Sequence, residues 1–508
     1  THILFLNAPN AQAADIALNN DSKHIKLTFV ATDEEAPLDG YDAIAIFGRG
    51  LHLSEEQQSA LEKIAEKGTP ILTISSNVAL SPLNFNLTGA ERMRLLQYFN
   101  NPNLTNYRNA LRALRQIATP HRMPQEEFDE PIQLPNNHYY HREYGQYFET
   151  KEELTNYLKQ KNIYHEDGKN RAFISGVNFP MEGNRAHVDT LIARLTKEGF
   201  NVYPIASPQG KSEMIRDLHP DAVVYYPMGR LGDEEFIDWL HTENIPLFCP
   251  FPLIQSTEEW LDPMIPVSGG VLNGRILVPE IDGAMTPLAI ATQNSHPSGY
   301  YLYTVEEERM NNFIQHVKKY LGLSKKANKD KKIAVCYFRS PGKDALLASG
   351  MEVIPSLYNF LKLLQAQGYD LTGLPTSLDA FKKRINTDGL ILGSYAKGAQ
   401  ENFLKNANPV WLSAKEYEEW AKAILAPHKY QEVIDRYGEA PGELLVKEDE
   451  SGEKQIAFAC LQFGNVILFP QPRPALGDDD FKLVHGMPVA PPHSYLAPYL
   501  YVHKGFGA

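Results

Sequence analysis

The sequence has few cysteines and no long hydrophobic run. Its three cysteines, Cys249, Cys336 and Cys460, are far apart, and each lies in an apolar stretch. No CxxC pair and no Cys/His spacing typical of a structural zinc site occurs, so we interpret the cysteines as buried free thiols. No apolar run reaches the ~18–20 residues that a membrane-spanning helix needs.

Basic residues are also in deficit. The 508 residues include 49 Lys and Arg against 62 Asp and Glu, a formal net charge of −13. Because a nucleic-acid partner requires a basic face that neutralises phosphates, this balance argues against nucleic-acid binding. The one dense basic run, 325–332, is typical of a solvated linker between domains.

Several catalytic signatures are missing as well. No turn between a predicted strand and a predicted helix carries GxGxxG or GxxxxGK[ST], and no nucleophile elbow for Ser/His/Asp catalysis is found. Nucleotide binding by this chain is therefore not predicted. If ATP is used, we expect another polypeptide to supply it.

What the sequence does have is a repeated alternation of short apolar strands with amphipathic helices. This pattern predicts an α/β fold built from several flavodoxin- or Rossmann-like parallel-sheet modules. The phrases LIARLTKEGFNVYPI and FLKLLQAQGYDLTGL share one plan, a long helix and a glycine before the next strand, which suggests repeated modules. We expect a β-rich segment over 443–469, near the C-terminus.

The pattern divides the chain into five expected segments. They are an N-terminal α/β domain (1–120), a linker and aromatic loop region (121–170), a second α/β module (171–325), a third α/β module (331–405), and a helical then β-rich segment (406–508). In the first, four strands are predicted at His2–Asn7, Ile25–Ala31, Ala43–Phe47 and Pro70–Ile74. A helix over Ser54–Lys67 begins with a capping pattern, Ser54 followed by Gln57.

The segment VPEIDG, 278–283, contains two carboxylates, Glu280 and Asp282, separated by one residue. If the segment follows a short strand and continues it, both side chains lie on one face and form a pair that could accept protons or guide a divalent cation. The alternative is a charged turn, because Asp-Gly is ordinary turn chemistry. Both interpretations remain open.

The C-terminal segment 470–508 is dense in proline, aromatic and histidine residues. A rigid proline-rich loop can hold polar side chains at fixed positions, and His493 follows a Pro-Pro pair. Neutral imidazole binds iron, cobalt or zinc and also carries protons near neutral pH, so His485 and His493 are the best histidine candidates. The alternative is structural: His493 caps a helix beginning near Tyr495, and His485 bonds a loop carbonyl.

Two other groups of residues are expected to be structural. The aromatic cluster at 139–148, which includes Tyr139, Tyr140 and His141, is typical of a loop packed onto a domain; a platform for a macrocycle is the alternative. His187, at the start of a helix, is expected to be a surface residue.

Five stretches resemble a known family, the large subunits of cobaltochelatase and magnesium chelatase. The matching phrases are VPEIDG (278–283), NPVWLSAKEYEEWAKAIL (408–425), DRYGEAPGEL (435–444), FGNVILFPQP (463–472) and the terminal segment (470–508). The resemblance spans most of the chain, and the family phrase continues beyond Ala508 into a motif rich in His, Gly and Glu. The chain therefore resembles the N-terminal part of such a protein.

The resemblance implies a site and its substrates. It assigns catalysis to His493, Glu280 and Asp282, metal ligation to His493, and tetrapyrrole binding to Gln471, Arg473, His485 and Tyr495. The substrates would be haem or another tetrapyrrole and a divalent metal, iron or cobalt. The implied partners are ATPase chelatase subunits, through which alone ATP would act, and the remainder of the same polypeptide beyond Ala508.

The sequence also departs from the cobalt branch of that family. Ser494 stands where that branch tends to have a second histidine, and the order Pro472-Arg473-Pro474 replaces Pro-Pro-Arg. The wording IPSLYNFLKLL and APPHSYLAPYL is closest to the haem-uptake (HmuS-type) branch, which implies removal of iron from haem. Insertion of cobalt or magnesium, and a non-catalytic tetrapyrrole-binding or partner-docking fragment, are the alternatives.

The location of the protein is left open by the sequence. The family implies the cytoplasm, whereas some members of the haem-uptake branch have an N-terminal membrane anchor. Thr1 as the first residue suits a trimmed anchor, and a cloning boundary explains it equally well.

Overall fold

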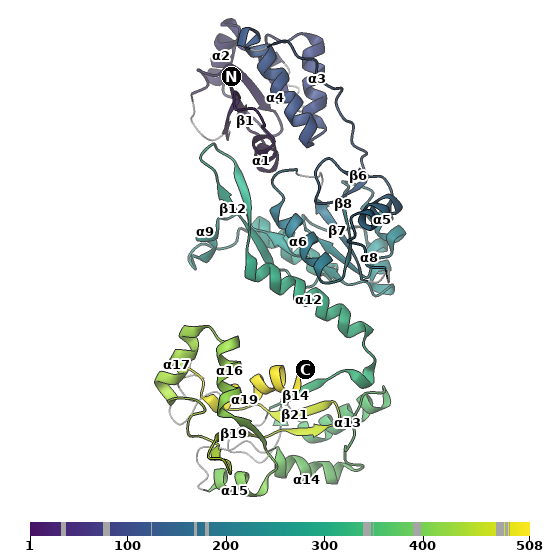
Figure 1. Ribbon diagram of the computed structural model, residues 1–508, viewed down its shortest axis with the longest axis vertical. Helices are drawn as coiled ribbons and strands as arrows, with labels where there is room; N and C mark the ends of the chain where they lie inside the picture. Colours follow the sequence, from purple (N-terminus) through teal and green to yellow (C-terminus); the bar gives the residue numbers. More distant parts are fainter. Residues whose placement is uncertain are drawn as a thin grey trace. The chain divides into compact units, whose positions relative to one another are not determined.

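The computed structural model (Figure 1) describes most of the chain as two compact units, Thr1–Gly322 and Leu323–Ala508. The residues described are 1–31, 37–74, 82–122, 124–166, 170–177, 182–338, 347–348, 350–389, 398–473, 482, 486 and 488–508. Each unit combines helices with sheets that contain parallel strands, which confirms the expected α/β class. The finer division into five segments stays a prediction.

The first sheet of the N-terminal unit is parallel and has the strand order β2-β1-β3-β4. Its strands match the four predicted ones: β1 (His2–Leu6), β2 (Lys26–Val30), β3 (Ala43–Phe47) and β4 (Ile71–Ile74). Side chains alternate between two cores, one under α1 (Asn10–Leu18), α3 (Gly89–Asn100) and α4 (Leu104–Ala118), the other under α2 (Glu55–Glu66). The predicted capping box of α2 is present, since Ser54 Oγ accepts from the Gln57 amide at 3.1 Å.

The second sheet has the strand order β10-β9-β7-β8-β5-β6. Four strands are parallel, β7 (Arg171–Val177), β8 (Asn201–Ala206), β9 (Ala222–Tyr225) and β10 (Leu247–Phe248), whereas β5 (His138–Tyr140) and β6 (Tyr147–Phe148) are antiparallel additions. The order of the parallel strands is flavodoxin-like, because the second strand in the chain lies on one side of the first and the next two lie on the other.

Helices cover both faces of this second sheet. One core contains residues of α6 (Ala186–Lys197) and α12 (Glu307–Lys325), and the opposite core contains residues of α5 (Lys151–Gln160), α7 (Lys211–Leu218) and α8 (Glu234–Thr242). The helices that follow β7 and β8 therefore pack on opposite faces. Such a change of side opens a crevice beyond the carboxyl ends of the strands, where ligands bind in many α/β folds.

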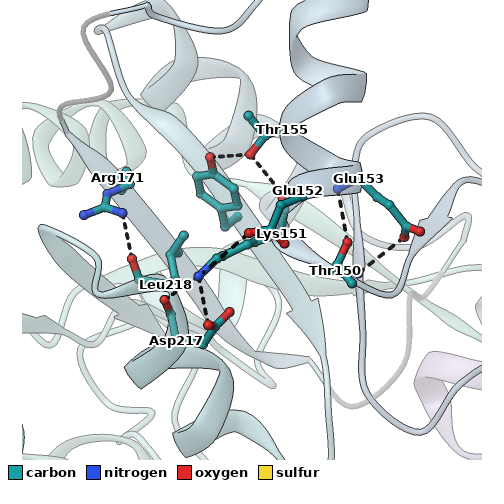
Figure 2. Close-up of polar contacts among 9 residues, drawn as sticks. Thr150, Lys151, Glu152, Glu153, Thr155, Arg171, Asp217 and Leu218 are labelled. Carbon is teal, nitrogen blue, oxygen red and sulfur yellow. Dashed lines mark hydrogen bonds and ion pairs between the residues drawn. The ribbon is translucent and has the colours of Figure 1, made fainter.

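Figure 2 shows how the C-terminal end of α7 is held. Lys151 Nζ, from the first turn of α5, donates to the Asp217 carbonyl at 2.7 Å and to its carboxylate at 2.8 Å, and Arg171 Nη1 donates to the Leu218 carbonyl at 2.8 Å. Cations at this end complement the partial negative charge of the last carbonyls of a helix.

A small third sheet completes the N-terminal unit. It has the order β11-β12-β13, with β11 (Phe251–Pro252), β12 (Ala289–Ser295) and β13 (Tyr301–Val305). Between β11 and β12 lie only helical elements: α9 (Thr257–Leu261), α10 (Gly269–Leu272), a π-helical turn (Asn273–Leu277) and α11 (Val278–Ile281). A 3₁₀ turn, Pro120–Arg122, follows α4.

In the C-terminal unit, the sheet that begins the predicted third module is completed by a distant strand. β14 (Ile333–Tyr337) pairs in parallel with β21 (Val466–Pro470), and β20 (Leu461–Phe463) pairs antiparallel with β21. The strand expected over 369–375 is wrong: this stretch is irregular and contains turns, and its apolar residues Leu371 and Leu374 contact the core as a loop. The other strand expected there, 389–393, lies almost entirely outside the described residues.

The remaining elements of this unit agree better with the sequence. The two predicted helices of the module are α13 (Val353–Ala366) and α14 (Leu378–Asp388), and the β-rich segment contains β18 (Val446–Glu448), β19 (Lys454–Phe458), β20 and β21. The other elements are β15 (Leu347–Ala348), β16 (Met351–Glu352), α15 (Ala399–Asn406), β17 (Val410–Ser413), α16 (Ala414–Ile424), α17 (Pro427–Tyr437), α19 (His493–Leu500), a 3₁₀ turn (Asn328–Asp330) and a π-helical end (Tyr501–Phe506). Across the described ranges, no helix combines the length and the apolar character needed to cross a membrane.

Candidate functional site

His493 is the first residue of α19 and is almost completely buried, with 2% of its surface exposed. The preceding Pro492 occupies the N-cap position in an extended conformation, so the helix begins where the Pro-Pro pair ends. The structural alternative, in which the His493 side chain caps a helix starting near Tyr495, is wrong. The helix starts two residues earlier, and no side chain caps it.

Both ring nitrogens of His493 are hydrogen-bonded. Nδ1 lies 2.8 Å from the Tyr417 hydroxyl of α16, and Nε2 lies 2.9 Å from the Gly438 carbonyl that follows α17. Because a carbonyl only accepts, Nε2 carries the proton, and Nδ1 accepts from the hydroxyl. Burial lowers the His493 pKa below its ordinary value, although the Gly438 carbonyl opposes this effect. The ring is therefore neutral at pH 7.

This bonding differs from the expected role of His493 as an axial metal ligand. A neutral imidazole has one lone pair for a metal, on the nitrogen without a proton. Here that lone pair, on Nδ1, accepts the Tyr417 hydrogen bond. Metal ligation by His493 therefore requires the Tyr417 bond to open.

Gly442 closes the loop after α17 around the histidine. Its φ is +74°, and a Cβ at this position would lie 2.9 Å from Cδ2 of His493. The loop can therefore pass against the imidazole only because residue 442 has no side chain. Tyr437 fixes the other side of the loop, since its hydroxyl donates to the Ala490 carbonyl at 2.9 Å.

A cavity of about 650 Å³ lies at this loop, and His493 is part of its wall. Its size is within the range of small-molecule sites in proteins. The wall combines an arginine, a glutamate, an amide and apolar groups: Gln400, Arg436, Tyr437, Gly438, Pro441, Gly442, Glu443, Leu444, Pro492, His493 and Ser494. Arg436 and Glu443 are exposed, so both charges face solvent or a ligand.

The other residues predicted at the C-terminal end do not line this cavity. Gln471 is exposed just after β21 and its backbone amide donates to the Tyr337 carbonyl at 2.9 Å, while Arg473 is partly buried. Tyr495 packs against Tyr499, with ring centroids 5.2 Å apart. Residues two apart on a helix point in nearly opposite directions, so Tyr495 and His493 serve different faces of α19. His485 lies outside the described residues.

The predicted pair Glu280 and Asp282 lies in the other unit and does not converge. The segment 278–283 follows a π-helical turn instead of a strand, and Glu280 belongs to the short helix α11. Glu280 is exposed, whereas the Asp282 side chain is fully buried. The expectation of a strand with both carboxylates on one face is therefore wrong, because a helical geometry separates residues two apart.

Asp282 nevertheless has an unusual environment. Its Oδ1 accepts from Arg230 Nε at 2.8 Å, and its Oδ2 has no hydrogen-bond partner among the residues described. Cys249 lies close enough that the carboxylate adds to the effect of burial in raising the pKa of the thiol. A buried carboxylate needs such a cationic partner, because removing it from water without one is costly.

The N-terminal unit contains a buried polar cluster that the sequence did not indicate. Glu182 is 2% exposed and accepts from the Leu104 amide at 2.6 Å, the first residue of α4, and from the Tyr147 hydroxyl at 2.8 Å. Asp15 accepts from the Asn184 amide at 3.0 Å, and burial raises the Asp15 pKa to about 8. These contacts join the first and second sheets of the unit.

Two expectations about individual residues can be compared with the structure. Tyr139 and Tyr140 are buried in β5 and pack into separate cores, which agrees with a structural role. The expectation of a surface His187 is wrong: it is 2% exposed, and its ring lies 4.2 Å from that of Tyr303 and 5.3 Å from that of Tyr226. The first turn of a helix can be buried when another strand covers it, and β13 does so here.

The histidine site itself depends on residues that sequence reasoning missed. Tyr417 and Gly438 bond His493, and Arg436 and Glu443 supply the charges of the cavity wall. All four lie in the phrases 408–425 and 435–444 that carry the family resemblance, so the signal was present without a role for each residue. In the part of the chain that is described, no three His, Cys, Asp or Glu side chains converge as a metal site.

Comparison with known proteins identifies one family. The family model described as CobN/Magnesium Chelatase matches residues 96–508, well over half of the chain. A magnesium-chelatase large chain from Chlorobaculum parvum is 23% identical over 403 residues, which cover 75% of this chain and 30% of that protein. The aerobic cobaltochelatase protein CobN of Pseudomonas aeruginosa is 23% identical over 343 residues, covering 64% of this chain and 26% of that protein.

One solved structure shares the fold. The catalytic subunit of cobaltochelatase from Mycobacterium tuberculosis superposes with a TM-score of 0.74 at 19% sequence identity, covering 100% of this chain and 42% of that one. The chain thus spans less than half the length of this structure and about a third or less of the two relatives above.

Proposed function

We propose that this chain, which belongs to the CobN/magnesium chelatase family, is the tetrapyrrole-binding part of a large chelatase subunit and that its substrate is haem, from which iron is removed. The observation that carries the proposal is the cavity of about 650 Å³ with the neutral imidazole of His493 in its wall. Support for haem comes from the wording of the segments 354–364 and 490–500, which resembles the haem-uptake branch.

The chemistry of iron removal sets what the wall must provide. Release of iron from haem leaves two pyrrole nitrogens that each take up one proton, while the departing metal is held on one side of the macrocycle. Glu443, exposed on the wall, and solvent are the proposed proton sources. Arg436 offers a guanidinium, the group best suited to the carboxylate side chains of such a macrocycle.

His493 has two proposed roles that the structure makes distinguishable. In the first, its Nδ1 exchanges the Tyr417 hydroxyl for iron and becomes an axial ligand. In the second, both hydrogen bonds persist, and the imidazole only shapes the cavity. Tyr417→Phe separates them, since it removes the competing hydroxyl while it keeps the ring that packs 5.3 Å from the imidazole.

Spectral titration with haem tests the proposal. We expect a saturable Soret shift with the wild-type chain, and a shift altered in His493→Ala and strengthened in Tyr417→Phe if His493 binds iron. An exposed histidine nearby, His428, provides the matched control, and His428→Ala should titrate as the wild type does. No Soret shift would sink haem as the substrate, and a shift unchanged in both His493→Ala and Tyr417→Phe would sink the ligand role.

The direction of the reaction needs a separate assay. The alternative function is ATP-dependent insertion of cobalt or magnesium into a corrin or porphyrin precursor, which the similarity to the two relatives above supports. Free porphyrin formed from haem without ATP would favour removal, whereas metal incorporation only with ATP and ATPase subunits present would favour insertion. Binding without turnover in either direction, even with the rest of a full-length chelatase chain added, would favour a docking or binding fragment.

A further inference from the structure

The loop between β8 and α7 lies at the carboxyl edge of the second sheet of the N-terminal unit. It reads Ser207-Pro208-Gln209-Gly210, and α7 begins with Lys211-Ser212. This is not a complete phosphate loop, but Gly-Lys-Ser after a parallel strand and at the start of a helix is the arrangement in which backbone amides and a lysine meet a phosphate. No side chain caps the first turn of α7.

Lys211 is placed against the electrostatic preference of its helix. It is the first residue of α7, where the helix dipole is positive and a cation is unfavourable. Its Nζ lies 5.3 Å from the Tyr225 ring centroid, and no carboxylate or other hydrogen-bond partner contacts it among the described residues. Burial lowers the pKa of Lys211. Glu213, also in the first turn, is exposed.

The opposite end of α7 shows what a compensated terminus looks like. There Lys151 and Arg171 donate to the last carbonyls, so cations face the negative end of the dipole (Figure 2). The N-terminal end has instead a lysine and unbonded amides, all of one sign. An anion at this end would complete the helix in the way that the cations complete the other.

A second, independent observation comes from β7. Ser175 is 1% exposed, and its Oγ has no hydrogen-bond partner in the described part of the chain. Ser175 is paired with Tyr225 in the parallel register of β7 and β9, so both side chains lie on the face that Lys211 covers. A buried hydroxyl without a partner is costly and rare, which points to a ligand atom on this face.

The neighbouring loop leaves the site without a competing carboxylate. Asp282, which acts on Tyr225 electrostatically, already accepts from Arg230. Ser212 lies against the loop after β9, since a Cβ at Gly232 would be 3.2 Å from its Oγ. The first turn of α7, Ser175 and the glycine loop thus form one polar edge at the crevice where the connections of the sheet change sides.

We propose that this edge is a binding site for a phosphate group, held by Lys211, the first amides of α7 and the Ser175 hydroxyl. The phosphate would be inorganic or the terminal group of a small phosphorylated molecule. The site lies in the N-terminal unit and is independent of the chelatase proposal, which concerns the cavity at His493.

Calorimetric titration of the full chain, in a phosphate-free buffer at constant ionic strength, tests this site. The probes are inorganic phosphate, pyrophosphate and ADP, and the variants are Lys211→Gln, Lys211→Arg and Ser175→Ala. We expect saturable phosphate binding that Lys211→Gln weakens at least tenfold and that Lys211→Arg largely retains, because arginine keeps the charge. Ser175→Ala should weaken binding several-fold.

The control is Lys197→Ala, an exposed lysine in the last turn of α6, which should leave every affinity unchanged. Tighter binding of ADP than of pyrophosphate would identify a nucleotide as the source of the phosphate, and equal or weaker binding would identify the phosphate alone. Circular dichroism confirms that each variant is folded. Absence of saturable binding by all three probes, or equal affinity of wild type and Lys211→Gln, would overturn the proposal.

Discussion

The hydroxyl of Tyr417 donates a hydrogen bond to Nδ1 of His493 across 2.8 Å, and both side chains are buried. The pair joins the first turn of α16 to the first turn of α19, which are separated by 76 residues in the sequence. It also occupies the lone pair with which the histidine would bind a metal. The contact therefore has both a structural and a chemical consequence.

Removal of the imidazole should destabilise the C-terminal unit. His493→Ala leaves the Tyr417 hydroxyl and the Gly438 carbonyl without their partner and opens a void, for which we expect a loss of about 3 kcal/mol. Urea unfolding followed by tryptophan fluorescence measures this loss. His428→Ala, at an exposed position, should change the free energy of unfolding by no more than about 0.5 kcal/mol. Equal effects of the two substitutions would contradict the role of the buried bonds.

A glycine comparison isolates the contact between the loop and the imidazole. Gly442 and Gly452 have similar backbones, with φ of +74° and +84°, but only a Cβ at Gly442 meets another group, the His493 ring at 2.9 Å. Both alanine variants should lose about 1–2 kcal/mol from the backbone conformation, and Gly442→Ala should lose about 1–3 kcal/mol more. Thermal unfolding measures the difference. If Gly442→Ala costs no more than Gly452→Ala, the loop does not depend on close approach to His493.

The buried His187 predicts how the N-terminal unit responds to acid. Burial lowers its pKa to about 3, and Arg275 adds to this effect, so the folded ring stays neutral while the unfolded ring takes up a proton near its ordinary pKa of 6.5. Since the unfolded state then binds more protons, the contribution of His187 to stability is complete above pH 6.5. It decreases by about 1.4 kcal/mol per unit as the pH falls from 6.5 toward 3.

His187→Phe tests this pH dependence, because phenylalanine keeps the ring that packs against Tyr226 and Tyr303 and does not titrate. Unfolding free energies measured between pH 7 and 4 should decrease less steeply in this variant than in the wild type. His24→Phe, at an exposed position, should leave the slope as it is. A parallel decrease in wild type and His187→Phe would show that other groups account for the acid response.

The asymmetry of the Arg230–Asp282 ion pair predicts an order of effects. Arg230 is 41% exposed at its side chain, whereas the Asp282 side chain is 0% exposed. Arg230→Ala should therefore cost about 3 kcal/mol, because it leaves a buried charge without a partner, and Asp282→Asn should cost less, because the arginine can return to water. Glu280→Gln, at the neighbouring exposed carboxylate, is the control and should be nearly neutral. Chemical unfolding of the three variants gives the order, and the reverse order would refute the argument.

The expected elements differ in how well local sequence predicted them. The four strands of the first sheet and helix α2 agree with the structure, because each has its own apolar run or capping box. The strand expected over 369–375 failed because Leu371 and Leu374 are buried as parts of a loop, and β14 finds its partner in β21, more than a hundred residues away. Apolar composition shows that a segment is buried, but it does not show which partner buries it.

The sequence by itself determined the α/β class, the family and His493 as a residue of interest. These depend on hydrophobic period, turn residues and phrases that are local in the chain. Only the tertiary structure decided that both nitrogens of His493 are hydrogen-bonded, that Glu280 and Asp282 do not converge, and that Lys211 lacks a counter-charge among the residues described. Each depends on burial and on contacts between residues distant in sequence, and the pattern of one segment carries no information about the segment that packs against it.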